Sequence, residues 1–310
     1  MDAIRCDGLT KTFGEVRALE GLTLTVPEGS IYGFLGPNGA GKTTTIRILT
    51  GLARASSGQA RVDGVDLAQD GADLARRIGY LPEEPAFYGW MSPIEYLDYI
   101  GRIFDLDAEE RRRRVSELLE LVGLTDVSKR RIAGFSRGMR QRLGLAQALV
   151  NRPHVLFLDE PASALDPAGR REVLEMVEGL RGSVTVFMST HILADVERVC
   201  DTIGIIARGR LITEAPRQEL LSRYAVPAYE VETHPENAAA LAAWAAALGD
   251  ASWLQGVSLD GHRCRLQVAD VERAGPLLMA ALAQSGLPVV RYQVVRPSLE
   301  DIFLRLVNQE

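Results

Sequence analysis

The sequence predicts an α/β domain followed by a smaller α+β domain. Three observations favour this fold class: the chain has 310 residues, apolar strand-like runs alternate with helical patterns over its first two thirds, and the pattern changes after Pro227. At about 150 residues per domain, this length favours two domains. We place the first domain at residues 1–224 and an accessory domain at residues 228–310.

Composition restricts the class of protein further. The apolar fraction of 46% and the charged fraction of 25% are ordinary for a globular protein. The net charge of −6 argues against binding nucleic acid through overall charge. The three cysteines lie far apart, which favours neither a disulfide framework nor a zinc site and points to a reducing compartment. We see no signal peptide, and the longest apolar run, 238–248, is too short for a bilayer, so we expect a cytoplasmic protein.

The first domain begins with a strand, loop and helix pattern. Residues 22–26 and 31–35 are apolar or alternating and are separated by a turn at 27–29, which predicts two strands. A glycine-rich turn follows at 36–41, and residues 42–49 open a helix. This succession is typical of the start of an α/β domain.

The middle of the chain predicts a helical insertion and a buried sheet. Residues from about 90 to 150 have a helical pattern, and within 107–122 the apolar side chains recur at the spacing of one helix face. The arginine run 111–114 is interpreted as a solvated helix surface. Short apolar strands around a helix then favour a mainly parallel, buried sheet. These strands are expected at 155–158, 184–188 and 202–206, with the helix near 167–180.

After Pro227 the pattern is that of a second, smaller unit. Its element order is β-α-β-β-α-β, the order of a ferredoxin-like fold. The strands are expected at 229–233, 253–259, 263–268 and 289–295, and the helices at 236–248 and 271–285. A short terminal helix is expected to open at Ser298, with Asp301 completing its cap.

Residues 36–43 match the phosphate-binding pattern G-x-x-x-x-G-K-[ST]. The glycines let the loop curl so that main-chain N–H groups point at phosphate oxygens, and the following helix adds its positive N-terminal end. Lys42 would then reach the β- and γ-phosphates, and the Thr43 hydroxyl would ligate Mg²⁺.

Two further patterns carry chemistry. The strand 155–158 ends in Asp159, placed as a second Mg²⁺-directed acid, and Glu160, which is free to polarise an attacking water. Upstream, Ser136 begins a helix with Gly138 close behind, and this arrangement offers a hydroxyl and free N–H groups to an anion.

In this order and context, the motifs resemble those of the ABC ATPase family, whose cassette is a P-loop NTPase. Residues 36–44 resemble its Walker A loop, 156–160 its Walker B strand, 135–141 its signature motif and 163–166 its D-loop, while His191 ends a strand as the switch histidine does. The resemblance is closest to ATP-binding subunits of bacterial export systems. Their C-terminal extension often ends in a segment like residues 297–303 of this chain.

The resemblance implies a role for each matching residue. Glu160, His191 and Lys42 are expected to be catalytic, Asp166 to organise a dimer, and Thr43 and Asp159 to hold Mg²⁺. In the signature, Ser136, Arg137, Gly138 and Met139 would meet the ATP of a facing protomer. The ATP-binding set comprises Phe13, which would stack on adenine, with Gly36, Pro37, Asn38, Gly39, Ala40, Gly41, Lys42, Thr43 and Thr44.

The resemblance also implies partners. Two copies would meet head to tail around two ATP molecules with Mg²⁺, because one chain has only one copy of each half-site. ATP-driven closure would power a separate transmembrane permease subunit, with this chain peripheral on the inner face of the membrane and no nucleic acid bound. Selectivity would lie in the permease, so the sequence identifies no transported substrate.

Two departures from the family pattern bear on coupling. Glu83 stands where the family usually has Gln, and it can offer an oxygen to Mg²⁺ but not an amide donor. The signature carries Arg137 and Met139 in place of the commonest residues. Beside the loop that contains Glu83, the aromatic stretch 87–92 either packs the helical insertion or contacts the permease.

Two other hypotheses stay open at this level. The first is a soluble ABC ATPase that acts on DNA or ribosomes. DNA-acting relatives carry a long coiled coil between Walker A and the signature, but only about 90 residues separate the two motifs here, without sustained heptads. Translation-factor relatives carry two ATPase domains in one chain, whereas this sequence has a single set of motifs. The second hypothesis is that the accessory domain acts chiefly as a ligand sensor or dimer clamp.

Overall fold

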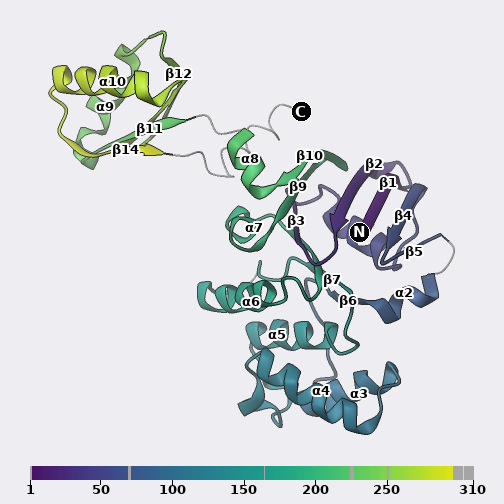
Figure 1. Ribbon diagram of the computed structural model, residues 1–310. Coiled ribbons are helices and arrows are strands. Elements are labelled where there is room, and N and C mark those ends of the chain that lie inside the picture. The colour runs from purple at the N-terminus through teal and green to yellow at the C-terminus, as the bar shows by residue number, and fades with distance from the viewer. Residues whose placement is uncertain are drawn as a thin grey trace. The chain divides into compact units, whose positions relative to one another are not determined.

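The structure is a computed structural model that describes residues 2–68, 71–163, 165–223, 227–249 and 251–295, together with residue 303 (Figure 1). The chain divides into two compact units, Met1–Arg217 and Gln218–Glu310. This division puts most of helix α8 (Arg217–Arg223) in the second unit, whereas the sequence-based boundary puts it in the first. The exact domain limits therefore stay a prediction.

The first unit is built on a six-stranded sheet. Its strands are β3 (Ile31–Leu35), β6 (Ile78–Leu81), β7 (Val155–Asp159), β8 (Thr185–Thr190), β9 (Thr202–Ala207) and β10 (Arg210–Pro216). The order is β10-β9-β3-β8-β7-β6, and all neighbours are parallel except β9 and β10. Every residue of β3, β7 and β8 is buried, as expected for strands covered on both faces. The predicted buried, mainly parallel sheet is confirmed.

A second, antiparallel sheet of this unit was not expected. It contains β1 (Asp2–Phe13), β2 (Val16–Pro27), β4 (Ser57–Val62) and β5 (Val65–Asp66) in the order β2-β1-β4-β5. The predicted strands 22–26 and 31–35 both exist, but they lie in different sheets as parts of β2 and β3. The sequence pattern does not predict strand β1, because irregular pairing around Gly8, with φ of 62°, breaks the alternation of its apolar residues.

The predicted helical insertion between β6 and β7 is confirmed. It contains α3 (Pro93–Ile103), α4 (Ala108–Leu121) and α5 (Arg137–Ala148), with short 3₁₀ turns at Thr125–Val127 and Ile132–Gly134. The N-cap of α4 is Asp107, whose carboxylate accepts the N–H groups of Glu109 and Glu110. The remaining helices of the unit are α1 (Lys42–Leu49), α2 (Gly71–Arg77), α6 (Pro167–Gly179) and α7 (Leu193–Val199).

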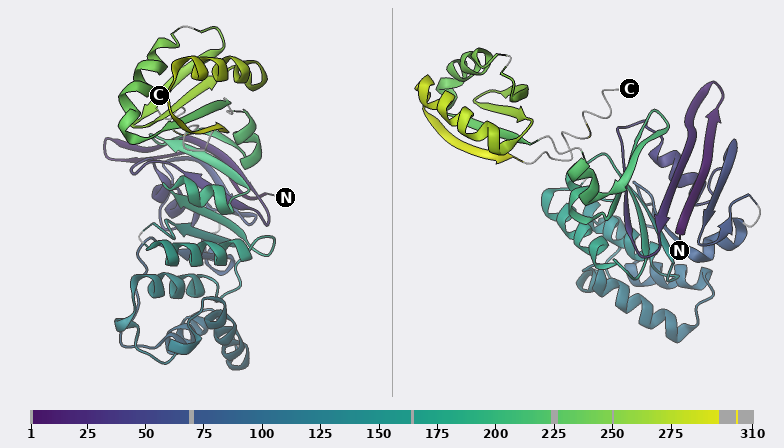
Figure 2. Two further views of the ribbon diagram at one scale, coloured as in Figure 1. Left: turned by 90° about the vertical axis from the view of Figure 1, so that its left-hand side faces the viewer. Right: turned by 45° about the horizontal axis from the view of Figure 1, so that its top comes forward.

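The second unit has the predicted ferredoxin-like order. Its elements are β11 (Ala228–Thr233), a 3₁₀ turn (Pro235–Asn237), α9 (Ala238–Ala247), β12 (Leu254–Asp260), β13 (Arg263–Val268), α10 (Val271–Ser285) and β14 (Val289–Val295). The antiparallel sheet has the order β12-β13-β11-β14. Alternate residues of its central strands, such as Val231 and Leu266, are buried in one core with the two helices, which lie against one face (Figure 2). The predicted helix at Ser298 and the family-like segment 297–303 fall outside the described residues, apart from residue 303.

The topology of the first unit brings its motifs together. The strands β3, β7 and β8 are parallel neighbours, so their carboxyl ends lie at one edge of the sheet. The glycine-rich loop follows β3, Glu160 follows β7 and His191 follows β8. Among the described residues, no helix is both long and apolar enough to cross a membrane.

Candidate active site

The loop between β3 and α1 depends on glycine at two positions. A Cβ at Gly36 would lie 2.4 Å from the carbonyl oxygen of Ile206, and one at Gly41 would lie 2.8 Å from that of Ala18. Gly41 also has φ of 110°, in the left-handed region, and directly precedes helix α1. The loop therefore curls tightly against neighbouring backbone and aims the start of α1 at the space above it.

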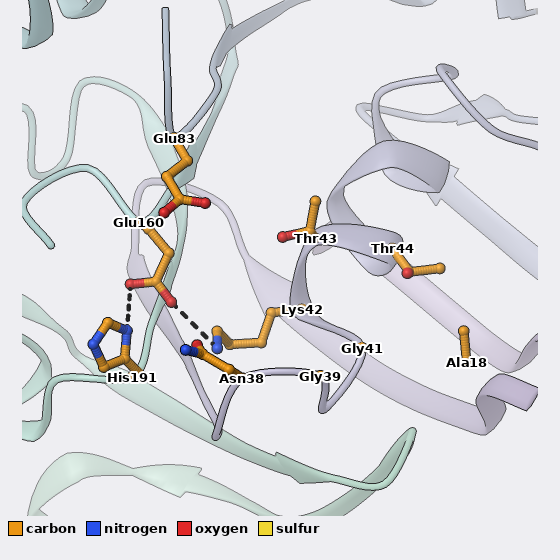
Figure 3. Close-up of a pocket in the computed structure, with 10 residues that line it drawn as sticks. All are labelled: Ala18, Asn38, Gly39, Gly41, Lys42, Thr43, Thr44, Glu83, Glu160 and His191. Carbon is orange, nitrogen blue, oxygen red and sulfur yellow. Dashed lines mark hydrogen bonds and ion pairs between the residues drawn. The ribbon is translucent and has the colours of Figure 1, made fainter. Parts of the chain in front are cut away.

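That space is a polar cavity of about 290 Å³. It unites the loop with residues from four other segments, as Figure 3 shows. Its lining residues are Ala18, Asn38, Gly39, Gly41, Lys42, Thr43, Thr44, Glu83, Glu160 and His191. Most of the residues expected around the phosphates of ATP thus surround one cavity.

Glu160 lies between two basic side chains (Figure 3). Its Oε1 is 3.2 Å from Lys42 Nζ, and its Oε2 is 2.9 Å from His191 Nδ1. Lys42 and Glu160 are 6% and 7% exposed, so this is a buried ion pair. Lys42 Nζ also donates to the carbonyl oxygens of Gly36, at 2.7 Å, and Pro37, at 3.2 Å. The cavity therefore holds a buried carboxylate whose two oxygens each face a nitrogen of a basic side chain.

Next to Glu160, Asp159 accepts hydrogen bonds from two hydroxyl groups. Its Oδ1 accepts from Ser189 Oγ at 2.6 Å and from Thr43 Oγ1 at 3.3 Å, and the residue is 2% exposed. A carboxylate and a hydroxyl this close fit Mg²⁺, which takes few protein ligands and leaves its other positions to water and phosphate. Glu83 lines the same cavity and offers a third oxygen group.

Ser189 is a site residue that sequence reasoning did not assign. Besides its bond to Asp159, its Oγ accepts the N–H of Glu160 at 3.1 Å. It thus contacts the carboxylate of Asp159 and the main chain of Glu160, and Glu160 itself adopts the left-handed region with φ of 49°. The only signal in the sequence is a polar residue near the end of an apolar strand. Its relevance follows from the pairing of Ser189 with Asp159 across β8 and β7.

The signature residues lie elsewhere in the same chain. Ser136 is the N-cap of α5 and accepts the N–H of Met139 at 3.2 Å. Arg137 lines a separate cavity with Glu84 and the shared Glu83. Asp166 caps α6 by accepting the N–H of Gly169 at 3.2 Å. Within one chain, the structure does not bring the signature or Asp166 to the cavity of Lys42.

Phe13 also lies outside the lining of this cavity. Its ring is 54% exposed on β1, with Lys11 Nζ 4.7 Å from the ring centroid. This exposure excludes Phe13 from the core, and its predicted stacking on adenine stays a prediction. Of the predicted D-loop, Ala164 falls outside the described residues.

Family models match most of the chain. The model described as ABC transporter matches residues 19–163, and the model of the C-terminal domain of DrrA1-3-like ATP-binding proteins matches residues 216–307.

Curated relatives match the chain over nearly its whole length. An uncharacterised ABC transporter ATP-binding protein of Bacillus subtilis, YxlF, is 37% identical over 97% of this chain and 98% of its own. The daunorubicin resistance ATP-binding protein DrrA3 of Streptomyces coeruleorubidus is 36% identical over 99% of this chain and 96% of its own. The bacitracin transport ATP-binding protein BcrA of Bacillus licheniformis is 34% identical, with 98% and 97% coverage.

Solved structures match about 70% of the chain. An ATP-binding subunit of an ABC transporter is 29% identical with a TM-score of 0.65, over 72% of this chain and 93% of that chain. A dimeric bacterial ABC transporter cassette, MJ0796, is 25% identical with a TM-score of 0.63, over 69% and 98%. The ABC ATPase fold expected from the motifs is confirmed.

Proposed function

This chain belongs to the ATP-binding proteins of ABC transporters, and we propose that its cavity is one half of an ATP-hydrolysing site that a second copy completes. It is thus an ATPase subunit of the transporter family. The observation that carries the proposal is the separation of two half-sites in one chain. Lys42 and Glu160 share a cavity, whereas Ser136 caps a different helix outside it.

The phosphates of ATP would lie in the glycine-rich loop. The main-chain N–H groups of residues 36–41 and the N-terminal end of α1 would bind their oxygens, and Lys42 would neutralise their charge. Thr43 and Asp159 would hold Mg²⁺, with Glu83 as a further oxygen ligand. When bound there, Mg²⁺ supplies positive charge to the β- and γ-phosphates.

Glu160 is the proposed general base. It would take a proton from the attacking water, a role that contributes about 10²–10⁴ in rate. Lys42 lies 3.2 Å from one of its oxygens. Phosphates bound in the loop would share this ammonium group, which would leave that oxygen able to face water. His191 keeps the other oxygen oriented from 2.9 Å and would also reach the γ-phosphate.

A facing copy would cover each nucleotide with its signature. Ser136 and Gly138, at the N-terminal end of α5, would present a hydroxyl and main-chain N–H groups to the γ-phosphate, with Arg137 and Met139 beside them. Among the described residues, an added Cβ at Gly138 would have only Leu165 nearby, at 3.9 Å, which leaves room there for a partner. Asp166 would meet the second copy, and Phe13 would stack on adenine. The dimeric cassette of MJ0796 supports this arrangement.

A membrane subunit is the proposed partner of the helical insertion. Tyr88 and Trp90 are 51% and 67% exposed, while Phe87 packs on Tyr96 with ring centroids 5.2 Å apart. The aromatic stretch is thus partly core and partly a free surface. A groove between β6 and α3, lined by Leu52 and Ile103 among others, would receive an amphipathic segment of a separate permease. We place this chain on the inner face of the cell membrane.

Export is the proposed direction of transport. The relatives are named for daunorubicin resistance and bacitracin transport, which supports an exporter without identifying this chain's substrate. The same names favour the transporter hypothesis over a soluble ATPase that acts on DNA or ribosomes. Stimulation of the ATPase by its permease, and not by DNA or ribosomes, is the result expected of a reconstituted complex.

The half-site proposal is tested by Glu160→Gln. This variant keeps the shape of the side chain but cannot accept the proton, so it should retain ATP, lose nearly all turnover and accumulate a closed dimer. Size-exclusion chromatography with ATP and Mg²⁺ measures the dimer. Glu28→Gln, at an exposed position, is the matched control and should behave as the wild type. Wild-type turnover in Glu160→Gln would remove Glu160 as the base, and a monomer that binds ATP would refute the shared site.

A further inference from the structure

A buried ion pair joins the two helices that follow the active-site loops. Arg170 lies in the first turns of α6, and its Nε donates to Asp195 Oδ1 of α7 at 2.6 Å. Asp195 is only 2% exposed, and Arg170 is 29% exposed. A pair this short and this buried holds its two helices at a fixed separation, because breaking it leaves an uncompensated charge in the interior.

Each partner of this pair is tied to a different part of the site. On α6, the N–H of Arg170 donates to the carbonyl oxygen of Asp166 at 2.9 Å, and Asp166 caps that helix. On α7, the N–H of Asp195 donates to the carbonyl oxygen of Ile192 at 3.2 Å, one residue after His191. The pair therefore connects the residue expected at the dimer interface with the segment that carries the histidine.

The electrostatic environment of Asp195 also connects it with Glu160 and His191. Burial raises the pKa of the Asp195 carboxyl, and the hydrogen bond from Arg170 opposes that rise. The charge of Glu160 raises the same pKa and that of His191 lowers it. Asp195 is thus close enough to both proposed catalytic groups to interact with them.

We propose that Arg170 and Asp195 are positioning residues. When a second copy binds at Asp166, they transmit the resulting movement to His191. The 2.9 Å contact between His191 and Glu160 then passes it to the proposed base. The inference rests on the proposed function. A movement of the start of α6 moves Arg170, because both belong to one hydrogen-bonded helix. The ion pair then moves α7 and the loop before it, so each base is aligned only when the dimer is closed. This link makes hydrolysis in the two sites cooperative.

The same two helices supply a matched control. Arg198 of α7 and Glu175 of α6 form an exposed ion pair, with Nη2 and Oε1 2.8 Å apart. This pair also joins α6 to α7, but it lies farther along both helices from Asp166 and His191. It should stabilise the packing of α6 on α7 slightly, without transmitting movement from Asp166 to His191.

The test replaces each pair by apolar residues, which keeps the buried site filled. In Arg170→Met with Asp195→Leu, we expect the ADP dissociation constant to stay unchanged. The turnover number should fall by about tenfold or more, as misplaced catalytic groups do, and the Hill coefficient for ATP should approach one. Arg198→Met with Glu175→Leu should match the wild type in all three. Arg170→Lys, which keeps the charge, should restore part of the turnover and cooperativity.

Two results would overturn the proposed positioning role of Arg170 and Asp195. One is wild-type turnover and cooperativity in the Arg170→Met, Asp195→Leu variant. The other is loss of ADP binding together with turnover, because the pair would then support the fold and not the alignment of His191. Failure of the proposed function looks different: the wild-type protein itself would then form no ATP-dependent dimer and show no cooperativity.

Discussion

The two units of this protein bury different kinds of side chain. The first encloses ionisable groups at the ends of its parallel strands and in the helices that follow them, among them Lys42, Asp159, Glu160 and Asp195. In the described part of the second unit, the buried polar residue is Thr233, and the core is otherwise apolar. Burial of charge is unfavourable unless each group is paired, so a cluster of buried charges marks the place where chemistry requires them.

This difference assigns different tasks to the two units. The first carries the strained and charged arrangement that we propose binds phosphate, while the second has the apolar core of a scaffold. A contribution of the second unit would therefore act through its surface. The hypothesis that it serves as a ligand sensor or dimer clamp is compatible with that, and it stays a prediction.

The largest effect is expected where the buried charge is removed. Lys42→Ala deletes the group that compensates Glu160 and would meet the phosphates. A lost charged hydrogen bond costs about 1.5–3 kcal/mol, so the ATP dissociation constant should rise by about 10- to 100-fold. Isothermal titration calorimetry measures it, with the exposed Lys129→Ala as control. An unchanged dissociation constant in Lys42→Ala would take this lysine out of the phosphate site.

A second variant tests the scaffold role of the other unit. Leu266 is fully buried between the sheet and helices of the second unit, and Leu266→Ala should lower its free energy of unfolding by about 2–5 kcal/mol. The affinity for ADP should not change. In a Trp90→Phe background, the remaining tryptophans all belong to this unit, so their fluorescence in urea reports its unfolding.

Leu259→Ala is the control for that experiment, because Leu259 lies on the neighbouring strand but is 47% exposed. It should change stability far less than Leu266→Ala. A loss of ADP affinity in Leu266→Ala would break the comparison, since it would mean that the second unit contributes to the nucleotide site.

The smallest effect concerns a half-buried acid of the first unit that has no proposed catalytic task. Burial raises the pKa of Glu214 on β10, whose Oε1 accepts the N–H of Thr25 at 3.4 Å. The folded state thus holds its proton more tightly than the unfolded state, so stability falls as the pH rises through the raised pKa. Glu214→Gln should remove this fall and stabilise the fold at pH 8 relative to pH 5, by on the order of 1 kcal/mol or less.

Thermal unfolding at the two pH values measures this shift. Glu20 supplies a control of opposite sign, because its hydrogen bonds from Arg210 and Arg17 lower its pKa. Removing that carboxylate with Glu20→Gln should reduce stability at the higher pH. Equal effects of Glu214→Gln at both pH values would show that burial of this acid is not unfavourable.

The motifs and the order of elements could be predicted because each depends on local chemistry. Only glycine tolerates the close backbone contacts at positions 36 and 41, so the loop is visible in the sequence. The β-α-β-β-α-β order of the second unit follows from alternating apolar patterns. By contrast, β1 was missed because its pairing is irregular, and the separate sheets of β2 and β3 depend on partners distant in the chain.

By itself, therefore, the sequence determined that a phosphate-binding loop, an acidic strand end and a signature exist in one chain with an accessory domain. Only the tertiary structure decided which of them meet. It put Ser189 against Asp159, Lys42 and His191 on the two oxygens of Glu160, and Ser136 outside their cavity. The physical reason is that strand register and helix packing are set by contacts between segments far apart in the chain, which no local pattern records.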